Sequence, residues 1–300
     1  MLGDIAPTQP KRSRGRPGVP NARRRTVVFD GDVLDKVEAR GENVSEVIRD
    51  LLAAHVVEYA PDASLPRSAT PSHPKAVAAR ENFDDFVEYL RKDEYTGTPV
   101  VQCDERKAWT DIRHHHAKAV VTSTLLGKTV QFAVLYPLWL LGRDPACRVA
   151  IVGRSREKAA ENVAECTHML KTCEKLREVF PALRFLGAGE DWLTVERPEG
   201  VPDPSLQAYG ADEGRGGSRF NVVVFDDVVS SADARHAGRM KKQRKHINVF
   251  LHGLVPTPHD GRTRTSAYLV GSKKWGGDLY DLMAEDGWPV FNFGGDPARF

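Results

Sequence analysis

Cysteine is scarce in this sequence. The 300 residues include four cysteines, and no two of them stand in a CxxC arrangement. This sparse, unpaired usage excludes a disulfide framework and favours a protein of the reducing cytosol. Cys166, His168 and Cys173 could be imagined as metal ligands, with the two cysteines on one helix face. We interpret the cysteines instead as small buried residues.

Long apolar runs are missing as well. Mean hydropathy is −0.42, and no apolar run approaches the ~20 residues that a helix needs to cross a bilayer. The longest run, 132–141, contains Pro137 and fits a buried helix better. The N-terminus soon becomes Arg-rich and lacks the apolar stretch of a secretory signal. We therefore expect a soluble globular protein with no membrane partner.

A large net charge is also absent, because 43 basic residues nearly balance 41 acidic ones. The basic residues are unevenly placed, since residues 11–25 contain seven Lys or Arg and no acid. Within this stretch, Arg14 and Arg16 form an Arg-Gly-Arg-Pro sequence that resembles the core of an AT-hook, a minor-groove binder. Either as such a hook or as a solvated basic tail, the segment should bind DNA with salt-sensitive affinity.

The chain divides into four parts by composition. Residues 1–24 are rich in Pro, Gly and Arg and are predicted to be disordered alone, and residues 25–58 form a strand-helix-helix pattern. Residues 59–75 have the Pro and Ser content of a linker. From 76 to 300, short β-branched runs alternate with helical patterns, which predicts an α/β domain with a mostly parallel sheet covered by helices.

The expected strands of this last part are 119–122, 148–152, 192–195, 221–225 and 267–270. The long helical patterns between them are 156–179 and 232–250.

The first candidate site follows the strand 119–122, where Gly127, Lys128 and Thr129 precede a helical run. A tight loop between strand and helix directs backbone N–H groups and a helix N-terminus at one spot, which binds phosphate. The Lys128 ammonium would reach the outer phosphates, and the Thr129 hydroxyl would ligate magnesium. The usual pattern has Gly five residues before the Gly-Lys pair, where this chain has Thr122.

The second candidate site is an apolar strand that ends in Asp226 and Asp227. Two carboxylates at the end of a buried strand are costly unless cations pair with them. In P-loop ATPases the first acid holds magnesium through water, and the second orients or deprotonates the attacking water. The alternative is a helix N-cap, because two serines and a helical pattern follow.

From about residue 100 to 300 the chain resembles the ATPase domain of phage terminase large subunits, the DNA-packaging motors. Five segments carry the resemblance, and their order and spacing are similar to those of the family. They are the deviant phosphate loop 123–129, the second strand and turn 151–155 with Ala159, the glycine-rich turn 214–217, the double-Asp strand 222–227, and the coupling motif 268–275 with Asp278 and Leu279.

The resemblance implies a RecA/ASCE-like P-loop fold that hydrolyses ATP with Mg²⁺ and translocates double-stranded DNA in the host cell cytoplasm. It places Leu126, Gly127, Lys128 and Thr129 around the phosphates. Magnesium would be held by Thr129 and Asp226. The implied partners are further copies of the chain, as a ring on a portal or a dimer through the N-terminal module, and a small terminase subunit.

The resemblance also assigns roles outside the two motifs. Ser272 would sense the γ-phosphate and pass the change to the moving part, although it could be an ordinary polar strand end. Gln102 and Trp109 lie where the family binds adenine, and for Trp109 a core position is the stronger interpretation. The run of His114 to His116 points in different directions on any regular element, so it predicts no metal site.

Three departures from the family affect these expectations. Terminases often carry an Arg in the loop roughly where Thr124 stands, so the charge-stabilising Arg would be Arg154, Arg215 or Arg219 in cis, or one from a neighbouring subunit. Asp227 replaces the commoner Glu and is one methylene shorter. The RNase H-like nuclease domain of the family would begin where the chain ends, so no nuclease activity is predicted.

The N-terminal module 25–58 resembles a ribbon-helix-helix domain. It is too small for a core of its own, and such domains solve this by dimerising. Their paired strands enter the DNA major groove. Taking Val27 and Phe29 as the inward pair, Arg25, Thr26 and Val28 would face DNA.

A further basic run, 239–245, follows the double-Asp strand on a helical stretch. It would suit a motor that grips DNA phosphates, or it forms an ordinary solvated face. Two other hypotheses stay open for the whole chain. It could be a ribbon-helix-helix regulator with a vestigial P-loop domain, or a helicase-like ATPase, although no second RecA-like lobe is apparent.

Overall fold

The computed structural model describes residues 71, 73–91, 102–123, 127–197, 201, 203–214, 217–255 and 265–293. The chain divides into two compact units, Met1–Pro61 and Asp62–Phe300, and every described residue belongs to the second. The predicted tail 1–24, the module 25–58 and most of the linker 59–75 lie outside the described residues. The first described helix, α3 (Pro74–Glu81), begins just before the domain boundary expected at 76.

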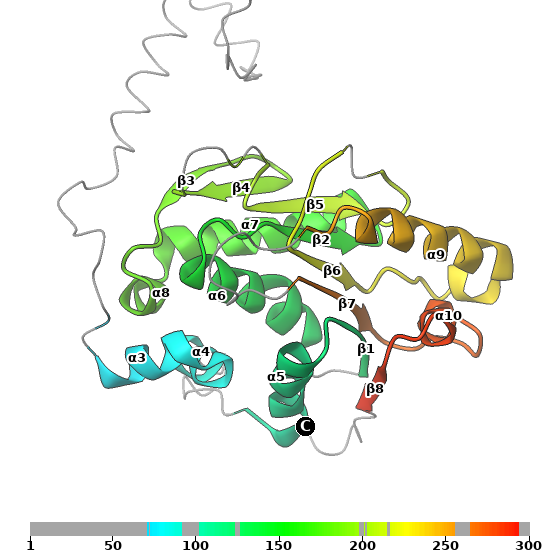
Figure 1. Cartoon of the computed structure of the whole chain (residues 1–300), viewed down its shortest axis with the longest axis horizontal. Helices are drawn as coiled ribbons and strands as arrows, with labels where there is room; N and C mark the ends of the chain where they lie inside the picture. Colours follow the sequence, from blue (N-terminus) through cyan, green and yellow to red (C-terminus); the bar gives the residue numbers. More distant parts are fainter. Residues whose placement is uncertain are drawn as a thin grey trace, which may run out of the picture. The chain divides into compact units, whose positions relative to one another are not determined.

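A single sheet of eight strands forms the centre of the described part (Figure 1). Its order is β3-β4-β5-β2-β6-β7-β1-β8, and its pairs are parallel except for β3–β4 and β4–β5. The strands are β1 (Lys118–Ser123), β2 (Val149–Gly153), β3 (Phe185–Ala188), β4 (Trp192–Val195), β5 (Leu206–Gly210), β6 (Val222–Asp226), β7 (Ser266–Gly271) and β8 (Val290–Phe293).

The strand order fixes where the two candidate motifs meet. Strand β7 lies between β1, which precedes the phosphate loop, and β6, which carries the two acids. The order β8-β1-β7-β6-β2 is that of RecA/ASCE-like P-loop domains, so the predicted fold class is confirmed. Because these strands are parallel, their carboxyl ends all open at one edge of the sheet, where ligands of α/β proteins bind.

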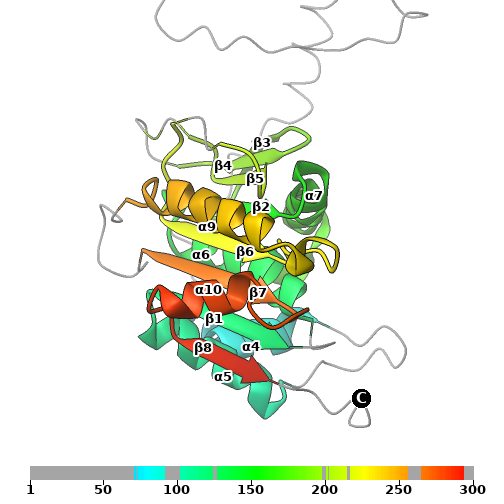
Figure 2. The same cartoon turned by 90° about the vertical axis from the view of Figure 1, so that its right-hand side faces the viewer.

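Helices cover both faces of the sheet. They are α3, α4 (Phe83–Leu90), α5 (Asp104–His115), the π-helix η1 (Val130–Leu135), α6 (Tyr136–Arg143), α7 (Arg156–Thr172), α8 (Glu174–Val179), the 3₁₀ turn η2 (Asp233–Arg235), α9 (Ala237–Leu251) and α10 (Leu279–Glu285). Successive strand residues point to opposite faces. Val149 and Ile151 accordingly pack in the cluster with α3–α8, whereas Ala150 and Val152 pack with α9 and α10. Figure 2 shows α9 and α10 lying across their face of the sheet.

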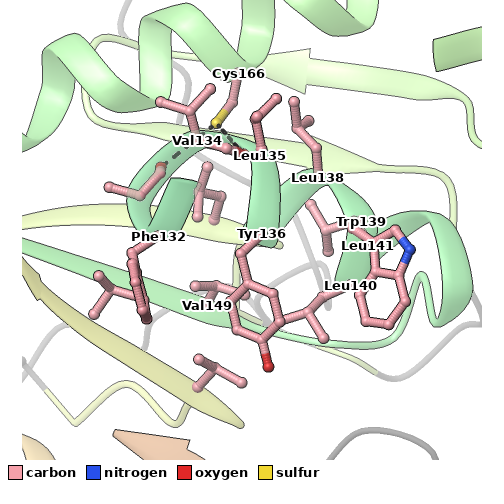
Figure 3. Close-up of a cluster of buried hydrophobic side chains, with 14 of the residues drawn as sticks. Phe132, Val134, Leu135, Tyr136, Leu138, Trp139, Leu140, Leu141, Val149 and Cys166 are labelled. Atoms are coloured by element: carbon pink, nitrogen blue, oxygen red, sulfur yellow. Dashed lines mark hydrogen bonds between the residues drawn. The ribbon is translucent and has the colours of Figure 1, made fainter. Parts of the chain in front are cut away.

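The longest apolar run, 132–141, forms the buried helix that the sequence predicts (Figure 3). It begins as the π-helix η1 and continues without a break as α6, in which Pro137 is the second residue. The thiol of Cys166 packs on this helix and donates to the carbonyl oxygens of Ala133 and Val134, 3.8 and 3.6 Å away. Cys166 is therefore a small buried residue, as expected.

Two helix predictions need correction. The pattern 156–179 forms two helices, α7 and α8, which are separated at Cys173, where the backbone is extended. The hydroxyl of Thr172 bonds the carbonyl of His168 in the last turn of α7, a contact that weakens helix continuation. Likewise 232–250 contains the turn η2 and then α9, with an extended residue at His236 between them. No helix among the described residues is long and apolar enough to cross a membrane.

Candidate nucleotide-binding site

The phosphate loop joins the carboxyl end of β1 to the helix that begins at Lys128. Thr124 and the predicted phosphate contact Leu126 lie outside the described residues. Gly127 has φ +72, a left-handed conformation that glycine adopts without strain. Its carbonyl accepts from the N–H of Gln131 at 3.1 Å, which starts the helix. The loop therefore ends in a helix N-terminus at the open edge of the sheet, a favourable place for an anion.

Lys128 folds back onto the base of its own loop. Its Nζ donates to the carbonyl oxygen of Ser123 at 2.6 Å. Burial lowers the pKa of Lys128, while the nearby carboxylates of Asp227 and Asp226 act in the opposite direction. The ammonium is thus held close to both acids, and a phosphate would offer it a stronger partner than a neutral carbonyl.

Thr129 and Asp226, predicted as the magnesium ligands, are in direct contact. The Thr129 hydroxyl donates to Asp226 Oδ1 at 3.0 Å, and Asn162 Nδ2 donates to Oδ2 at 3.4 Å. Asp226 is only 8% exposed. Burial raises its pKa to about 6, and Asp227 adds to the rise, against the lowering effect of Thr129, Asn162 and Lys128. Ionising a carboxylate buried this deeply is costly, and a bound cation would offset that cost. The oxygens of Thr129 and Asp226 fit a hard cation such as Mg²⁺.

The chain turns sharply at Asp227, the residue after Asp226, and both acids line the same cleft. Asp227 has φ +44, the only positive φ of a non-glycine residue in the described ranges. Its N–H still donates to the carbonyl of Val270 at 2.9 Å, so the turn begins where the ladder ends. The exposed carboxylate lies 3.9 Å from Lys274 Nζ. Such local strain often marks functional positions.

The helix-cap alternative for the two acids has no support in the hydrogen bonds. Ser230 Oγ accepts from the N–H of Asp233, the first residue of the turn η2, at 3.0 Å. The oxygens of Asp226 accept from Thr129 and Asn162 instead.

Ser272, just beyond β7, reaches the phosphate loop. Its hydroxyl donates to the carbonyl of Ser123 at 2.8 Å, the same oxygen that Lys128 contacts. Ser272 and Lys128 therefore share one acceptor at the base of the phosphate loop.

Helix α7 forms the opposite wall of the site. A cleft of about 240 Å³ is lined by Thr129, Gly153, Arg154, Lys158, Glu161, Asn162, Asp226 and Asp227. The helix approaches β2 closely, because a Cβ on Gly153 would lie 2.9 Å from the backbone N of Ala159. Arg154 is exposed and borders the cleft, as one of the predicted charge-stabilising arginines should.

Sequence reasoning missed the contribution of α7. Lys158, Glu161 and Asn162 are spaced i, i+3 and i+4, so they share one helix face. That face begins one turn after Ser155, which caps the helix by accepting from the N–H of Lys158 at 3.4 Å. The spacing could have indicated a polar face toward the second strand's carboxyl end, but nothing in it identifies Asn162 as a partner of Asp226.

The predicted adenine contacts do not line this cleft. Trp109 has no exposed surface and packs against Phe132 and Phe293, with ring centroids 5.8 and 6.0 Å away. It is a core residue, so its assignment to cofactor binding is corrected. Gln102 is also buried, and its Oε1 accepts from Gln131 Nε2 at 2.7 Å. Gln102 therefore touches the helix that follows the phosphate loop.

Among the described residues, Arg219 is a predicted charge-stabilising arginine that does not line the cleft. Arg219 is exposed, and its backbone N–H donates to Asp203 at 3.4 Å. Arg215 and the predicted DNA contacts Arg14, Arg16, Arg25, Thr26 and Val28 lie outside the described residues.

Fold and strand order together define the described part of the chain as a P-loop NTPase-type α/β domain. The chain is similar to the terminase large subunit of Enterobacteria phage T3, with 26% identity over 125 residues, 41% of this chain and 21% of the T3 protein. The match thus spans about a fifth of that relative's length. It confirms the predicted resemblance to terminase large subunits.

Two solved structures are also similar to the chain. One is the large terminase of bacteriophage HK97, with 17% identity, TM-score 0.46 and coverage of 71% of this chain and 43% of that one. The other is a point mutant of the large terminase ATPase domain of Thermus phage P74-26, with 16% identity, TM-score 0.43 and coverage of 71% and 85%. No family model matches the chain.

Proposed function

We propose that this chain contains the ATP-hydrolysing motor domain of a phage terminase large subunit, which packages double-stranded DNA. The observation that carries the proposal is the contact between Thr129, at the start of the loop helix, and Asp226, at the end of β6, with Lys128 beside them. The similarity to the T3 terminase large subunit supports the same class of protein.

The residues divide the work of hydrolysis among them. Lys128 would leave the Ser123 carbonyl and bind the outer phosphates, while Thr129 and Asp226 would hold Mg²⁺. The cation would supply positive charge against the charge that develops on the phosphates. Asp227, whose exposed carboxylate lines the cleft, would position the attacking water and accept its proton.

The proposed motor moves DNA, and helix α9 is the element that is proposed to contact the DNA. The helix buries Met240, Ile247 and Phe250, while its exposed lysines are Lys241, Lys242 and Lys245. Within the described ranges these lysines form no ion pair, whereas Arg239 and Arg244 on the same helix are paired with acids. Unpaired lysines on one helix suit phosphate contacts that release counterions. The portal, the small terminase subunit and further copies of the chain are proposed partners by resemblance.

Hydrolysis of ATP by the purified chain tests the proposed activity. Lys128→Ala should lower Mg²⁺-dependent turnover by at least about 100-fold, as loss of a preorganised charge contact does. Lys107→Ala, on the exposed side of α5, is the matched control and should leave turnover unchanged. A chain that binds DNA but neither binds nor hydrolyses ATP would favour the alternative, a regulator with a vestigial P-loop domain.

A further inference from the structure

The loop after β7 brings a second lysine to the site. Lys274 Nζ lies 3.9 Å from Asp227 Oδ1, and the Lys274 side chain is 28% exposed.

The backbone of this loop is fixed on both sides of Lys274. Before it, Ser272 is tied to the phosphate loop through the carbonyl of Ser123. After it, the fully buried Asp278 accepts from the N–H groups of Lys274 and Trp275 at 3.0 and 3.3 Å. Lys274 is therefore presented from a fixed backbone, and only its side chain needs to move.

The neighbouring lysine points elsewhere. Lys273 Nζ pairs with Asp281 Oδ1 at 2.7 Å, on the first turn of α10. The two adjacent lysines thus carry the same charge in the same loop, but only Lys274 reaches Asp227. The substitution Lys273→Ala is therefore a matched control for the loss of one positive charge from this loop.

We propose that Lys274 binds the γ-phosphate of ATP in cis and stabilises the charge that develops there during hydrolysis. It would add a second cation to the one that Lys128 supplies, because residues 123–129 contain no other basic residue. This role rests on the proposed ATPase function. A γ-phosphate between Lys128 and the water held by Asp227 lies within reach of Lys274, because Lys274 already contacts Asp227.

The geometry also allows a simpler role, in which Lys274 only holds Asp227 away from water. The two roles predict opposite effects of removing the lysine. A phosphate-binding lysine is needed for turnover, whereas a lysine that restrains the general base slows turnover. A phosphate-binding lysine also distinguishes a nucleoside triphosphate from a diphosphate, and a restraint on Asp227 does not.

The experiment uses the full chain and three variants: Lys274→Ala, Lys274→Arg and Lys273→Ala. The kcat and KM of ATP hydrolysis are measured with Mg²⁺, together with the affinities for ADP and for the slowly hydrolysed analogue ATPγS. We expect Lys274→Ala to lower kcat by about 30-fold or more, on the scale of a lost transition-state contact. The affinity of Lys274→Ala for ATPγS should fall about tenfold, and its affinity for ADP should fall less than twofold. The kcat should be largely restored in Lys274→Arg and unchanged in Lys273→Ala.

Several outcomes would overturn this role. They are unchanged or faster turnover in Lys274→Ala, equal losses of ADP and ATPγS affinity, or the same defect in Lys273→Ala. If the unaltered chain turns over too slowly to measure, the ratio of the two affinities still decides the question. If the unaltered chain binds neither nucleotide, the proposed ATPase function itself fails, which is a different result from a selective failure of Lys274.

Discussion

Asp226 is the residue at which function and stability conflict most directly. Its carboxylate is buried at the end of β6, and its pKa is raised to about 6 from an ordinary value of 3.8. A shift of about two pH units corresponds to about 3 kcal/mol of destabilisation once the group is ionised. The cation that this residue is proposed to hold would remove that cost.

Asp226→Asn should therefore stabilise the chain at pH 8 without Mg²⁺ or nucleotide. The free energy of unfolding should rise by about 2–3 kcal/mol, while ATP hydrolysis is lost. The direction of this pH dependence follows from the raised pKa of Asp226. As pH rises, the Asp226 carboxyl group loses its proton in the unfolded state before it does so in the folded state, so the unaltered chain loses stability from about pH 4 to pH 6. Urea unfolding at pH 4 and pH 8 measures this, and the gain should vanish at pH 4. A variant less stable than the parent at pH 8 would contradict the assignment.

At the scale of the elements, the site depends on how closely α7 lies against β2. Gly153 ends the strand, and Ser155 begins the helix two residues later. The absence of a Cβ at Gly153 lets the backbone of Ala159 approach it. This approach places the cleft-lining face of α7, with Asn162, beside Asp226.

Gly153→Ala should push α7 away from the sheet. We expect a loss of about 1–3 kcal/mol of folding free energy from the overpacked contact, measured by urea unfolding, with weaker nucleotide binding. Gly238→Ala on α9 is the matched control, since no atom lies within 4 Å of its added Cβ. That control should be neutral or stabilising by up to about 1 kcal/mol. Equal behaviour of the two variants would mean that the close approach is unimportant.

Helix α9 carries the proposed DNA contact. Replacing Lys241, Lys242 and Lys245 with Ala should weaken DNA binding and flatten its salt dependence. Each lost phosphate contact removes about 0.9 from the slope of log K against log salt, so the slope should fall by up to about 2.7. Fluorescence anisotropy with duplex DNA at several salt concentrations measures it. The charge-matched control replaces Lys75, Lys107 and Lys171, on α3, α5 and α7. An equal effect in both triple variants would contradict a specific role for α9.

At the scale of the whole molecule, the order of the parallel strands assembles the candidate site from segments that are far apart in sequence. It brings the loop after β1, the acids after β6 and Ser272 after β7 to one edge. The sequence predicts these residues because they stand at the ends of strongly apolar strands. All five predicted strands are present within one residue of their expected bounds.

What the sequence does not predict depends on tertiary contacts. Strands β3 and β8 are only partly buried and include Gly187 and Asn292, and β5 contains Gln207 and Gly210, so none of them has the apolar pattern of β4. The break at Cys173 has neither Gly nor Pro to mark it. Asn162 and Lys274 join the site only because α7 and the loop after β7 fold back on it, which local spacing does not encode.

The most direct test of the account is ATP hydrolysis by the full chain with and without double-stranded DNA, compared between the unaltered protein and Lys128→Ala. The account predicts Mg²⁺-dependent hydrolysis that DNA stimulates, and its loss in the variant in both conditions. Normal hydrolysis by Lys128→Ala, or hydrolysis that DNA leaves unchanged, would contradict a DNA-translocating motor built on this site.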